Sequence, residues 1–381
     1  MPISYWRSLR NAAPALAAIL IAAGCNGGSG NGLTPAASQP MLSNPGVATN
    51  GASPDTSMLK ELTKQVVIGS IVDPVNGAGN PYGLTVAPIT SGLLTKGDLV
   101  ACNFNAKSGK QGTGRSIVAL HPAAGSSPIH VSSDKTLVGC DALALDGGDG
   151  IWAAAMVAND NPVLSSSGKL ITNISGKPFN QPWGQIYAST KTGSPAFYAT
   201  NAGTGSIVRI NLGSKFTYDV IGSGFPVNHG VPGTALAPSG LAYNVSNDTL
   251  YFADGENNTV VAFKNVTKIP KGGIKAKNNG MSFSGPSASD ASIVFAGTPL
   301  NGPISTALLP NGNLVVGNTL DPNGKNLMIE LSASGKLLDV RNVDKGAAGA
   351  LFGIVATGTN DSNTKIYFND DNDNNIQVLE K

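Results

Sequence analysis

A pattern of short apolar runs that repeats along the chain is the strongest constraint on its fold. Residues 238–263 show one unit of the pattern, with apolar runs at 241–243, 250–253 and 260–263. Clusters of Asn, Asp, Ser and Gly separate these runs. Aromatic and β-branched runs bounded by turn-forming residues are typical of strands joined by hairpins. The unit therefore predicts a small antiparallel meander.

Five further segments repeat this unit, each with a characteristic start, a second apolar run and a third apolar run. The six starts are Pro81-Tyr82-Gly83-Leu84, Cys140-Asp141-Ala142-Leu143, Pro182-Trp183-Gly184-Gln185, Pro238-Ser239-Gly240-Leu241, Gly302-Pro303-Ile304-Ser305 and Leu351-Phe352-Gly353-Ile354. The third runs are residues 117–120, 169–171, 206–210, 259–263, 327–331 and 376–379. The starts are spaced by roughly 40 to 65 residues, the period of a four-stranded propeller blade with variable loops.

Six such repeats predict an all-β fold, a six-bladed β-propeller. A content of 48 Gly with only 13% charged residues also favours a turn-rich β protein over a helical one. The last repeat contains only three runs, whereas residues 65–72 form a strand-like segment before the first repeat. We expect this segment to be the outer strand of the last blade, because ring closure removes exposed sheet edges. Seven blades or an open solenoid are the alternatives.

The first 24 residues have the features of a secretory signal. Arg7 and Arg10 precede an apolar stretch at 12–23, and small residues lead directly to Cys25. This arrangement resembles the lipobox of bacterial lipoproteins, in which the signal is cut before a Cys that then carries lipid. The resemblance implies lipidation of Cys25; an ordinary signal followed by a chance Cys is the alternative. Asn26, where Asp would favour the inner membrane, favours the outer membrane.

Residues 25–57 are expected to form a flexible tether, because Gly, Ser, Pro, Ala and Asn without periodicity bury too little apolar surface to order. The predicted organisation is a signal peptide at 1–24, this tether, and a propeller domain at 58–381. The expected location is the bacterial cell envelope, with the protein facing the periplasm or the surface. Its expected partners are the membrane, through the lipid, and envelope proteins or glycans.

The charge distribution argues against nucleic-acid binding. The net charge is +2, and Arg7 and Arg10 account for it because the remaining 23 basic residues match 23 acidic ones. The Lys residues are also scattered along the chain. Non-specific nucleic-acid binding requires clustered Lys and Arg that neutralise phosphates, so no nucleic-acid partner is expected.

Residues 238–263 resemble an NHL repeat and, more loosely, the repeats of six-bladed propellers of the gluconolactonase and senescence-marker family. The resemblance covers residues 65–381. Members of that family hold a divalent metal on the propeller axis with a Glu, an Asn and an Asp. Here Ser239 replaces the Asn, the start at 81–84 contains no acid, and Asp141 and Asp146 lack partners. We therefore expect no metal and no cofactor.

Two other groups of residues suggest chemistry only weakly. Residues 370–375 (DDNDNN) have alternate acidic positions like a calcium loop, but Ile376 stands where the turn requires Gly. A polar hairpin loop between two strands is the preferred interpretation. Cys102 and Cys140 could form a disulfide in an exported protein, or could pack as two buried thiols. The sequence leaves these two possibilities open.

The repeats predict one face of the propeller that gathers aromatic and polar side chains around the axis. The candidate ligand-binding residues are Tyr82, Asn103, Asn105, Trp183, Asn201, His229, Asp254, Asn318, Phe352 and Asn369. Aromatic groups with a few polar groups suit a small molecule or a glycan, and the scarcity of charge favours a neutral, hydroxyl-rich ligand. In the alternative, the Asn and Asp residues end strands and the aromatic residues pack between blades.

We therefore expect a binding or interaction module without catalysis, and we assign no catalytic residue. The alternative function is that of a lactonase-like hydrolase or a lyase acting on the axial face. A convergent group of acids would favour the enzyme, and the sequence shows none.

Overall fold

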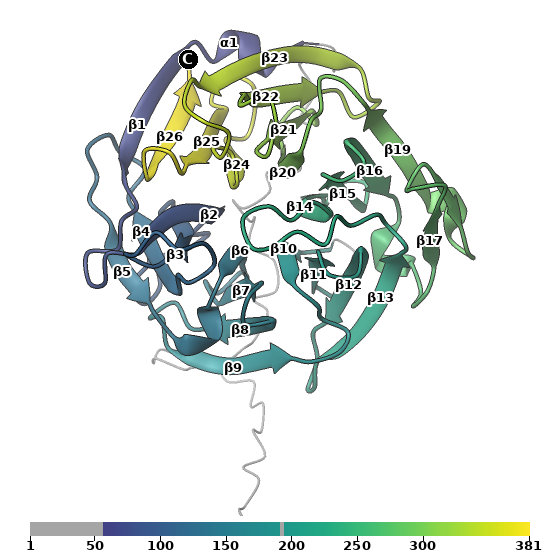
Figure 1. The fold of residues 1–381 in the computed structure, drawn as a ribbon, viewed down its shortest axis with the longest axis horizontal. Coiled ribbons are helices and arrows are strands. Elements are labelled where there is room, and N and C mark those ends of the chain that lie inside the picture. The colour runs from purple at the N-terminus through teal and green to yellow at the C-terminus, as the bar shows by residue number, and fades with distance from the viewer. Residues whose placement is uncertain (1–55, 191–193) are drawn as a thin grey trace, which may run out of the picture. The chain divides into compact units, whose positions relative to one another are not determined.

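The computed structural model describes residues 56–190 and 194–381. Six sheets surround a central axis as the blades of a propeller (Figure 1). The predicted all-β, six-bladed fold is therefore confirmed. The signal, Cys25 and most of the predicted tether lie outside the described residues. Within the described residues, no helix has the length and apolar character needed to cross a membrane.

In the first five blades the strands run in chain order from the axis outward. Blade 1 contains β2 (Gly79–Val86), β3 (Leu99–Asn105), β4 (Ser116–Leu120) and β5 (Ile129–Ser132). Blade 2 contains β6 (Cys140–Leu145), β7 (Ile151–Ala155), β8 (Asp160–Leu164) and β9 (Leu170–Ser175). Blade 3 contains β10 (Pro182–Ala188), β11 (Ala196–Asn201), β12 (Ser206–Asn211) and β13 (Thr217–Ser223).

The other three blades complete the ring. Blade 4 contains β14 (Pro238–Asn244), β15 (Thr249–Asp254), β16 (Thr259–Phe263) and β19 (Ala291–Ala296). Blade 5 contains β20 (Pro303–Leu308), β21 (Leu314–Asn318), β22 (Asn326–Leu331) and β23 (Leu337–Asp344). Blade 6 contains β24 (Ile354–Thr357), β25 (Lys365–Asp370), β26 (Asn375–Glu380) and, as its outer strand, β1 (Lys64–Ser70). The short helices are α1 (Met58–Glu61), η1 (Lys135–Leu137), η2 (Val266–Lys268) and η3 (Ala288–Asp290).

The N-terminal strand joins the last blade. β1 pairs antiparallel with β26, with Val66 opposite Val378, so the 65–72 segment lies where the repeat pattern places it. The preceding helix α1 is attached to blade 5, because the backbone amides of Met58 and Leu59 donate hydrogen bonds to the carboxylate of Glu330. Both ends of the described chain are thus fixed next to each other (Figure 1).

Glycines in the repeat starts allow the inner strands to approach one another at the axis. A Cβ atom at Gly184 would lie 2.2 Å from the carbonyl oxygen of Ser239 in the next blade. A Cβ atom at Gly353 would lie 2.5 Å from the carbonyl oxygen of Tyr82. Both distances are shorter than real Cβ contacts, so a larger residue would push neighbouring blades apart.

Two features differ from the expected strand pattern. The third strand of blade 2 is β8, and the predicted run at 169–171 instead overlaps the outer strand β9. Pro162 obscures β8 in the sequence because it lacks an N–H, and the pairing with β7 is interrupted opposite it. In blade 4, an inserted hairpin of β17 (Ile274–Lys277) and β18 (Ser282–Ser284) leaves its own blade and extends blade 3, where β17 pairs parallel with β13.

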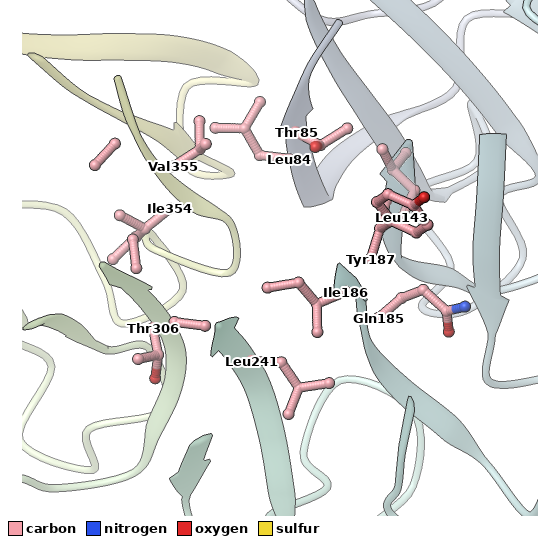
Figure 2. Close-up of a pocket in the computed structure, with 14 residues that line it drawn as sticks. Leu84, Thr85, Leu143, Gln185, Ile186, Tyr187, Leu241, Thr306, Ile354 and Val355 are labelled. Carbon is pink, nitrogen blue, oxygen red and sulfur yellow. The ribbon is translucent and has the colours of Figure 1, made fainter. Parts of the chain in front are cut away.

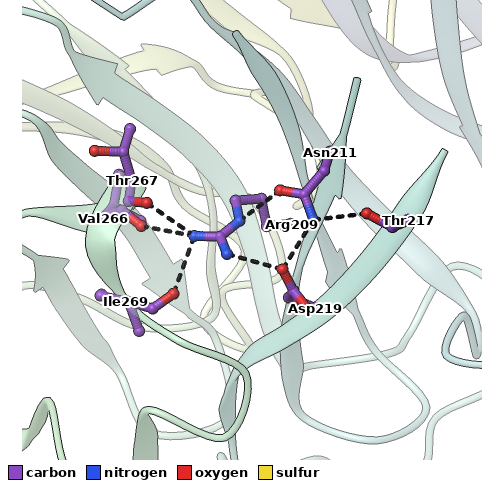
Figure 3. A network of polar contacts seen from close by, with 7 residues as sticks. All are labelled: Arg209, Asn211, Thr217, Asp219, Val266, Thr267 and Ile269. Atoms are coloured by element: carbon purple, nitrogen blue, oxygen red, sulfur yellow. Dashed lines mark hydrogen bonds and ion pairs between the residues drawn. The ribbon is translucent and has the colours of Figure 1, made fainter. Parts of the chain in front are cut away.

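Arg209 fixes this insertion to blade 3. One guanidinium nitrogen of Arg209, on β12, donates to the carbonyl oxygens of Val266, Thr267 and Ile269 around η2 (Figure 3). The other terminal nitrogen donates to the Asp219 carboxylate at 2.8 Å. The Arg fork is thus shared between two blades, which gives it a structural role.

A disulfide joins Cys102 on β3 to Cys140 on β6, with 5.6 Å between the Cα atoms. The structure therefore contains the first of the two arrangements that the sequence allowed. The bond links blades 1 and 2, and its Cys140 directly precedes Asp141 in the chain.

Candidate functional site

The candidate site is the central channel, and its upper ring is set by β-bulges in the inner strands. In five of the six inner strands the ladder shifts register just after the strand begins. Bulges redirect a side chain away from the regular alternation. The residues at this position, together with the corresponding residue before β24, are here called the bulge ring. In order around the axis they are Tyr82, Asp141, Trp183, Ser239, Ile304 and Phe352.

Aromatic residues of the bulge ring lie together and are buried. The Tyr82 ring stacks between Phe104 at 4.0 Å and Phe352 at 3.5 Å. Trp183 and Ile304 belong to the same buried cluster. The loop at 224–237 adds Ala235 and Ala237 to the cluster, so this loop covers the aromatic end of the channel.

Two overlapping cavities of about 60 Å³ each lie along the axis. Asp141, Trp183, Ile304 and Phe352 line the aromatic-side cavity. Both cavities share a second ring of residues, one from each inner strand: Leu84, Leu143, Gln185, Leu241, Thr306 and Ile354. Figure 2 shows the aliphatic-side cavity, with Ile186 extended toward the centre and the Gln185 amide turned toward a neighbouring strand. Cavities of this volume can hold a few water molecules or a small head group.

Three polar side chains that line the channel make no hydrogen bond within the described part of the chain. They are Asp141 through both carboxyl oxygens, Gln185 through both amide atoms, and Thr306 through its hydroxyl. Asp141 is only 3% exposed, and burial raises the pKa of its carboxyl well above the usual range. Since buried polar groups almost always have partners, these three groups are the unusual feature of the channel lining.

Four of the predicted Asn side chains are instead bonded to backbone. Asn201 donates to the carbonyl oxygen of Pro178 at 3.1 Å, and Asn318 donates to that of Pro299 at 2.7 Å. Asn103 and Asn369 likewise donate to the carbonyl oxygens of Ile71 and Tyr82. These amides hold the chain segments that lead into inner strands.

Asn105 organises a loop of blade 1, because its amide oxygen accepts a hydrogen bond from the backbone N–H of Gly112 at 3.1 Å. His229 is exposed on the loop at 224–237, with a left-handed φ of 54°. The structure therefore does not bring either residue into the lining of the two cavities.

Asp254 ends β15 at the position that Asn occupies in neighbouring blades. A carboxylate cannot donate the hydrogen bond that Asn201 and Asn318 make to backbone in those blades. In blade 4 the amide of Asn228 donates instead, to the carbonyl oxygen of Thr234 at 2.9 Å. Asp254 is fully buried without a hydrogen bond of good geometry. Burial raises its pKa from 3.8 to about 7, although the nearby backbone N–H of Asn257 lowers it in part. Asp254 does not line either cavity.

The axial residues do not fit the metal site of the lactonase propellers. The Ser239 hydroxyl donates to the carbonyl oxygen of Ile304 at 2.8 Å. Asp146 accepts a hydrogen bond from the indole N–H of Trp152 at 3.1 Å. Ser239 and Asp146 are thus bonded to other groups and do not join Asp141 as metal ligands. No group of three metal-ligating His, Cys, Asp or Glu occurs in the described ranges.

Comparisons with known proteins support the fold. No protein-family model matches the sequence, and the search of curated proteins gave no match. Among solved structures, a gluconolactonase from Xanthomonas campestris is similar with a TM-score of 0.52 and 14% identity, covering 80% of this chain and 86% of that one. A calcium-binding regucalcin from Agrobacterium tumefaciens has a TM-score of 0.50 and 13% identity, covering 82% and 93%.

A virginiamycin B lyase from Staphylococcus aureus is also similar, with a TM-score of 0.48 and 16% identity, covering 84% of this chain and 99% of that one. Fold and comparisons together define the class of this protein, a six-bladed β-propeller. Identities this low show the shared fold alone.

Gln185 and Thr306 were not among the sequence candidates, and Asp141 was considered only as a metal ligand, although a signal for all three exists. When the six starts are aligned, Asp141 falls in the column of Tyr82 and Trp183, and Gln185 and Thr306 fall two positions later among Leu and Ile. The signal is a polar residue at an aligned position where most of the other repeats have an apolar residue that faces the axis.

Proposed function

We propose that this protein is a lipid-anchored, extracytoplasmic binding module that holds a small ligand in its central channel. The main support is the set of unpartnered polar groups of Asp141, Gln185 and Thr306 in cavities beside an aromatic cluster. A small-molecule site typically combines apolar walls with a few placed polar groups. A ligand that bonded these groups would remove the cost of burying them alone.

The proposed location rests on the sequence of residues 1–57. The basic and apolar signal segment ends at Cys25, and the low-complexity tether that follows separates Cys25 from the propeller. A lipid on Cys25 with more than one acyl chain would hold the protein firmly at a membrane. Cys25→Ser should shift the protein from the membrane fraction to the soluble fraction, and continued membrane partitioning would exclude lipid anchoring.

Ligand binding is tested with the full chain in detergent. A panel of sugars, peptidoglycan fragments and small polar molecules is screened by thermal shift and then by calorimetry. Thr306→Val keeps the shape of the side chain but removes the channel hydroxyl, and Thr217→Val, at an exposed position on β13, is the matched control. We expect wild type and the control to bind the same compounds, and Thr306→Val to bind them more weakly.

Two results would overturn this function. If no compound of the panel shifts the melting temperature, the channel is not a ligand site. If the purified protein hydrolyses lactones at a rate that Thr306→Val lowers, the channel is catalytic and the enzyme alternative is correct.

A further inference from the structure

The geometry points to the class of ligand: we infer that the channel binds a small organic ammonium group, with Asp141 as its anionic partner. This inference rests on the proposed binding function. It departs from the neutral, hydroxyl-rich ligand that the composition favoured. The reason is the position of one carboxyl group in the bulge ring.

Asp141 is placed between two aromatic residues in the order of the ring. Tyr82 precedes it on blade 1, and Trp183 follows it on blade 3. Each inner strand contacts the next around the axis, and a Cβ atom at Gly83 would lie 2.7 Å from the Cα atom of Ala142. The start of blade 2, which carries Asp141, is therefore tightly held against blade 1.

Asp141 is the only carboxyl group that lines either cavity, and no Lys, Arg or His lines them among the described residues. Both of its oxygens lack a hydrogen-bond partner although the side chain is only 3% exposed. Burying a charge alone is very unfavourable, and buried charges in proteins are normally paired. The protein supplies no cation here, so a cationic ligand is the partner that suits this group.

The walls of the same cavity favour a cation as well. Trp183 and Phe352 line it together with Asp141, and Tyr82 stacks on Phe352 at 3.5 Å. Aromatic faces attract ammonium groups through their quadrupole, Trp most strongly. A site that combines one carboxylate with aromatic walls is selective for organic ammonium over a neutral sugar, which would leave the carboxyl without an ionic partner.

The number of acceptors also fits a primary ammonium group. Such a group has three donors and no acceptor. Both oxygens of Asp141, the amide oxygen of Gln185 and the hydroxyl oxygen of Thr306 are unpartnered acceptors in the aromatic-side cavity, enough for the three donors of an ammonium group. The cavity volume of about 60 Å³ suits an ammonium head group and excludes a bulky ring.

Ammonium binding should be accompanied by proton release. Burial raises the pKa of the Asp141 carboxyl and so favours its protonated form in the free protein, whereas a bound cation stabilises the ionised form. Ammonium binding then releases protons over the pH range in which free Asp141 is protonated, and over that range the affinity rises with pH. Tyr82 is the titratable group nearest in the ring order, and burial raises its pKa well above the usual range, so it stays neutral.

The test compares n-butylammonium chloride with n-butanol, a neutral probe of the same length, by calorimetry on the full chain at several pH values. We expect n-butylammonium to bind at least about tenfold more tightly than n-butanol. Asp141→Asn should weaken n-butylammonium binding at least about thirtyfold and leave n-butanol unchanged. Asp254→Asn is the matched control, because it removes another buried, unpartnered carboxyl that lies outside the cavities.

Several results would overturn the inference: equal binding of the two probes, no n-butylammonium binding, or unchanged affinity in Asp141→Asn. Proton release is measured on wild type in buffers of different ionisation enthalpy, so this arm holds even if Asp141→Asn fails to fold. Binding without proton release at every pH tested would contradict the role of Asp141. If sugars bind in a Thr306-dependent way and amines do not, the ammonium inference fails while the proposed binding function stands.

Discussion

Replacing Glu330 by Gln should detach the N-terminal segment from blade 5, and the hydrogen bonds determine the expected cost. Glu330 on β22 is fully buried. One carboxylate oxygen accepts from the backbone N–H of Met58 at 3.0 Å and from the Asn313 amide at 2.8 Å. The other accepts from the Ser57 hydroxyl at 2.7 Å and from the backbone N–H of Leu59 at 2.9 Å.

In Glu330→Gln an NH₂ group replaces one oxygen, so two of the four accepted hydrogen bonds are lost. The new N–H groups then face the N–H or O–H groups that donated those two bonds. Hydrogen bonds to a charged group contribute roughly 1.5–3 kcal/mol each, so the loss should be about 3–6 kcal/mol. The buried side chains of Met58, Leu59 and Leu62 oppose detachment. Because the segment can open locally, the loss cannot exceed the free energy with which it docks.

Hydrogen exchange at residues 57–62 and urea unfolding would measure this effect. We expect faster exchange across that segment and a lower free energy of unfolding in Glu330→Gln. Glu380→Gln is the control: its ion pair with Lys365 is partly exposed, so its loss should be at most about 1 kcal/mol. If Glu330→Gln matches wild type in exchange and stability, the carboxylate does not anchor α1.

Two further predictions concern ring closure and pH. Deleting residues 65–72 removes the buried Ile68 and Ile71 and exposes β26, so the free energy of unfolding should fall by at least about 4 kcal/mol. Deleting residues 26–55 should leave the free energy of unfolding unchanged. Equal urea midpoints for the two deletions would contradict closure of the ring by the N-terminal strand. The Asp254 carboxyl has a pKa raised from 3.8 to about 7, so folded protein keeps a proton that unfolded chain releases, and the contribution of this group to stability should decline by about 4 kcal/mol as pH rises from about 4 to 7. Asp254→Asn should flatten this decline in urea titrations at each pH, and an unchanged slope would show that another group causes it.

Strand spacing made the propeller predictable because each blade repeats the same local chemistry. The apolar runs that become β14, β15 and β16 are bounded by turn residues, and the structure turns where those residues occur. The polar stretch before Ile376 is the hairpin between β25 and β26, which matches the preferred interpretation over a calcium loop.

Features that depend on contacts between repeats were not predictable from these runs. β8 contains Pro162, which weakens the strand signal, and its pairing is decided by the strands on either side. The β17–β18 hairpin buries Ile274 and Ala276 in the core cluster that blades 3 and 4 share, and it pairs with β13 of blade 3. Nothing in the local sequence of the insertion shows which sheet it extends.

The site was partly predictable for a similar reason. Tyr82, Trp183 and Phe352 were recognisable because the same position of three repeats is aromatic, and they do meet in one cluster. The strand-end Asn residues were also recognisable, yet the repeat pattern cannot show that Asn201 and Asn318 use their amides on nearby backbone. Distinguishing an unbonded polar group from a bonded one requires coordinates.

Departure from the repeat is therefore more informative about function than the repeat itself. A position that serves packing in every blade should carry similar residues, as the Gly of four starts does at the closest approach of inner strands. The bulge ring surrounds a channel instead, and there Asp141 stands among aromatic, aliphatic and hydroxyl side chains. One buried carboxyl disfavours folding unless something compensates it, and the cationic ligand inferred above would supply that compensation.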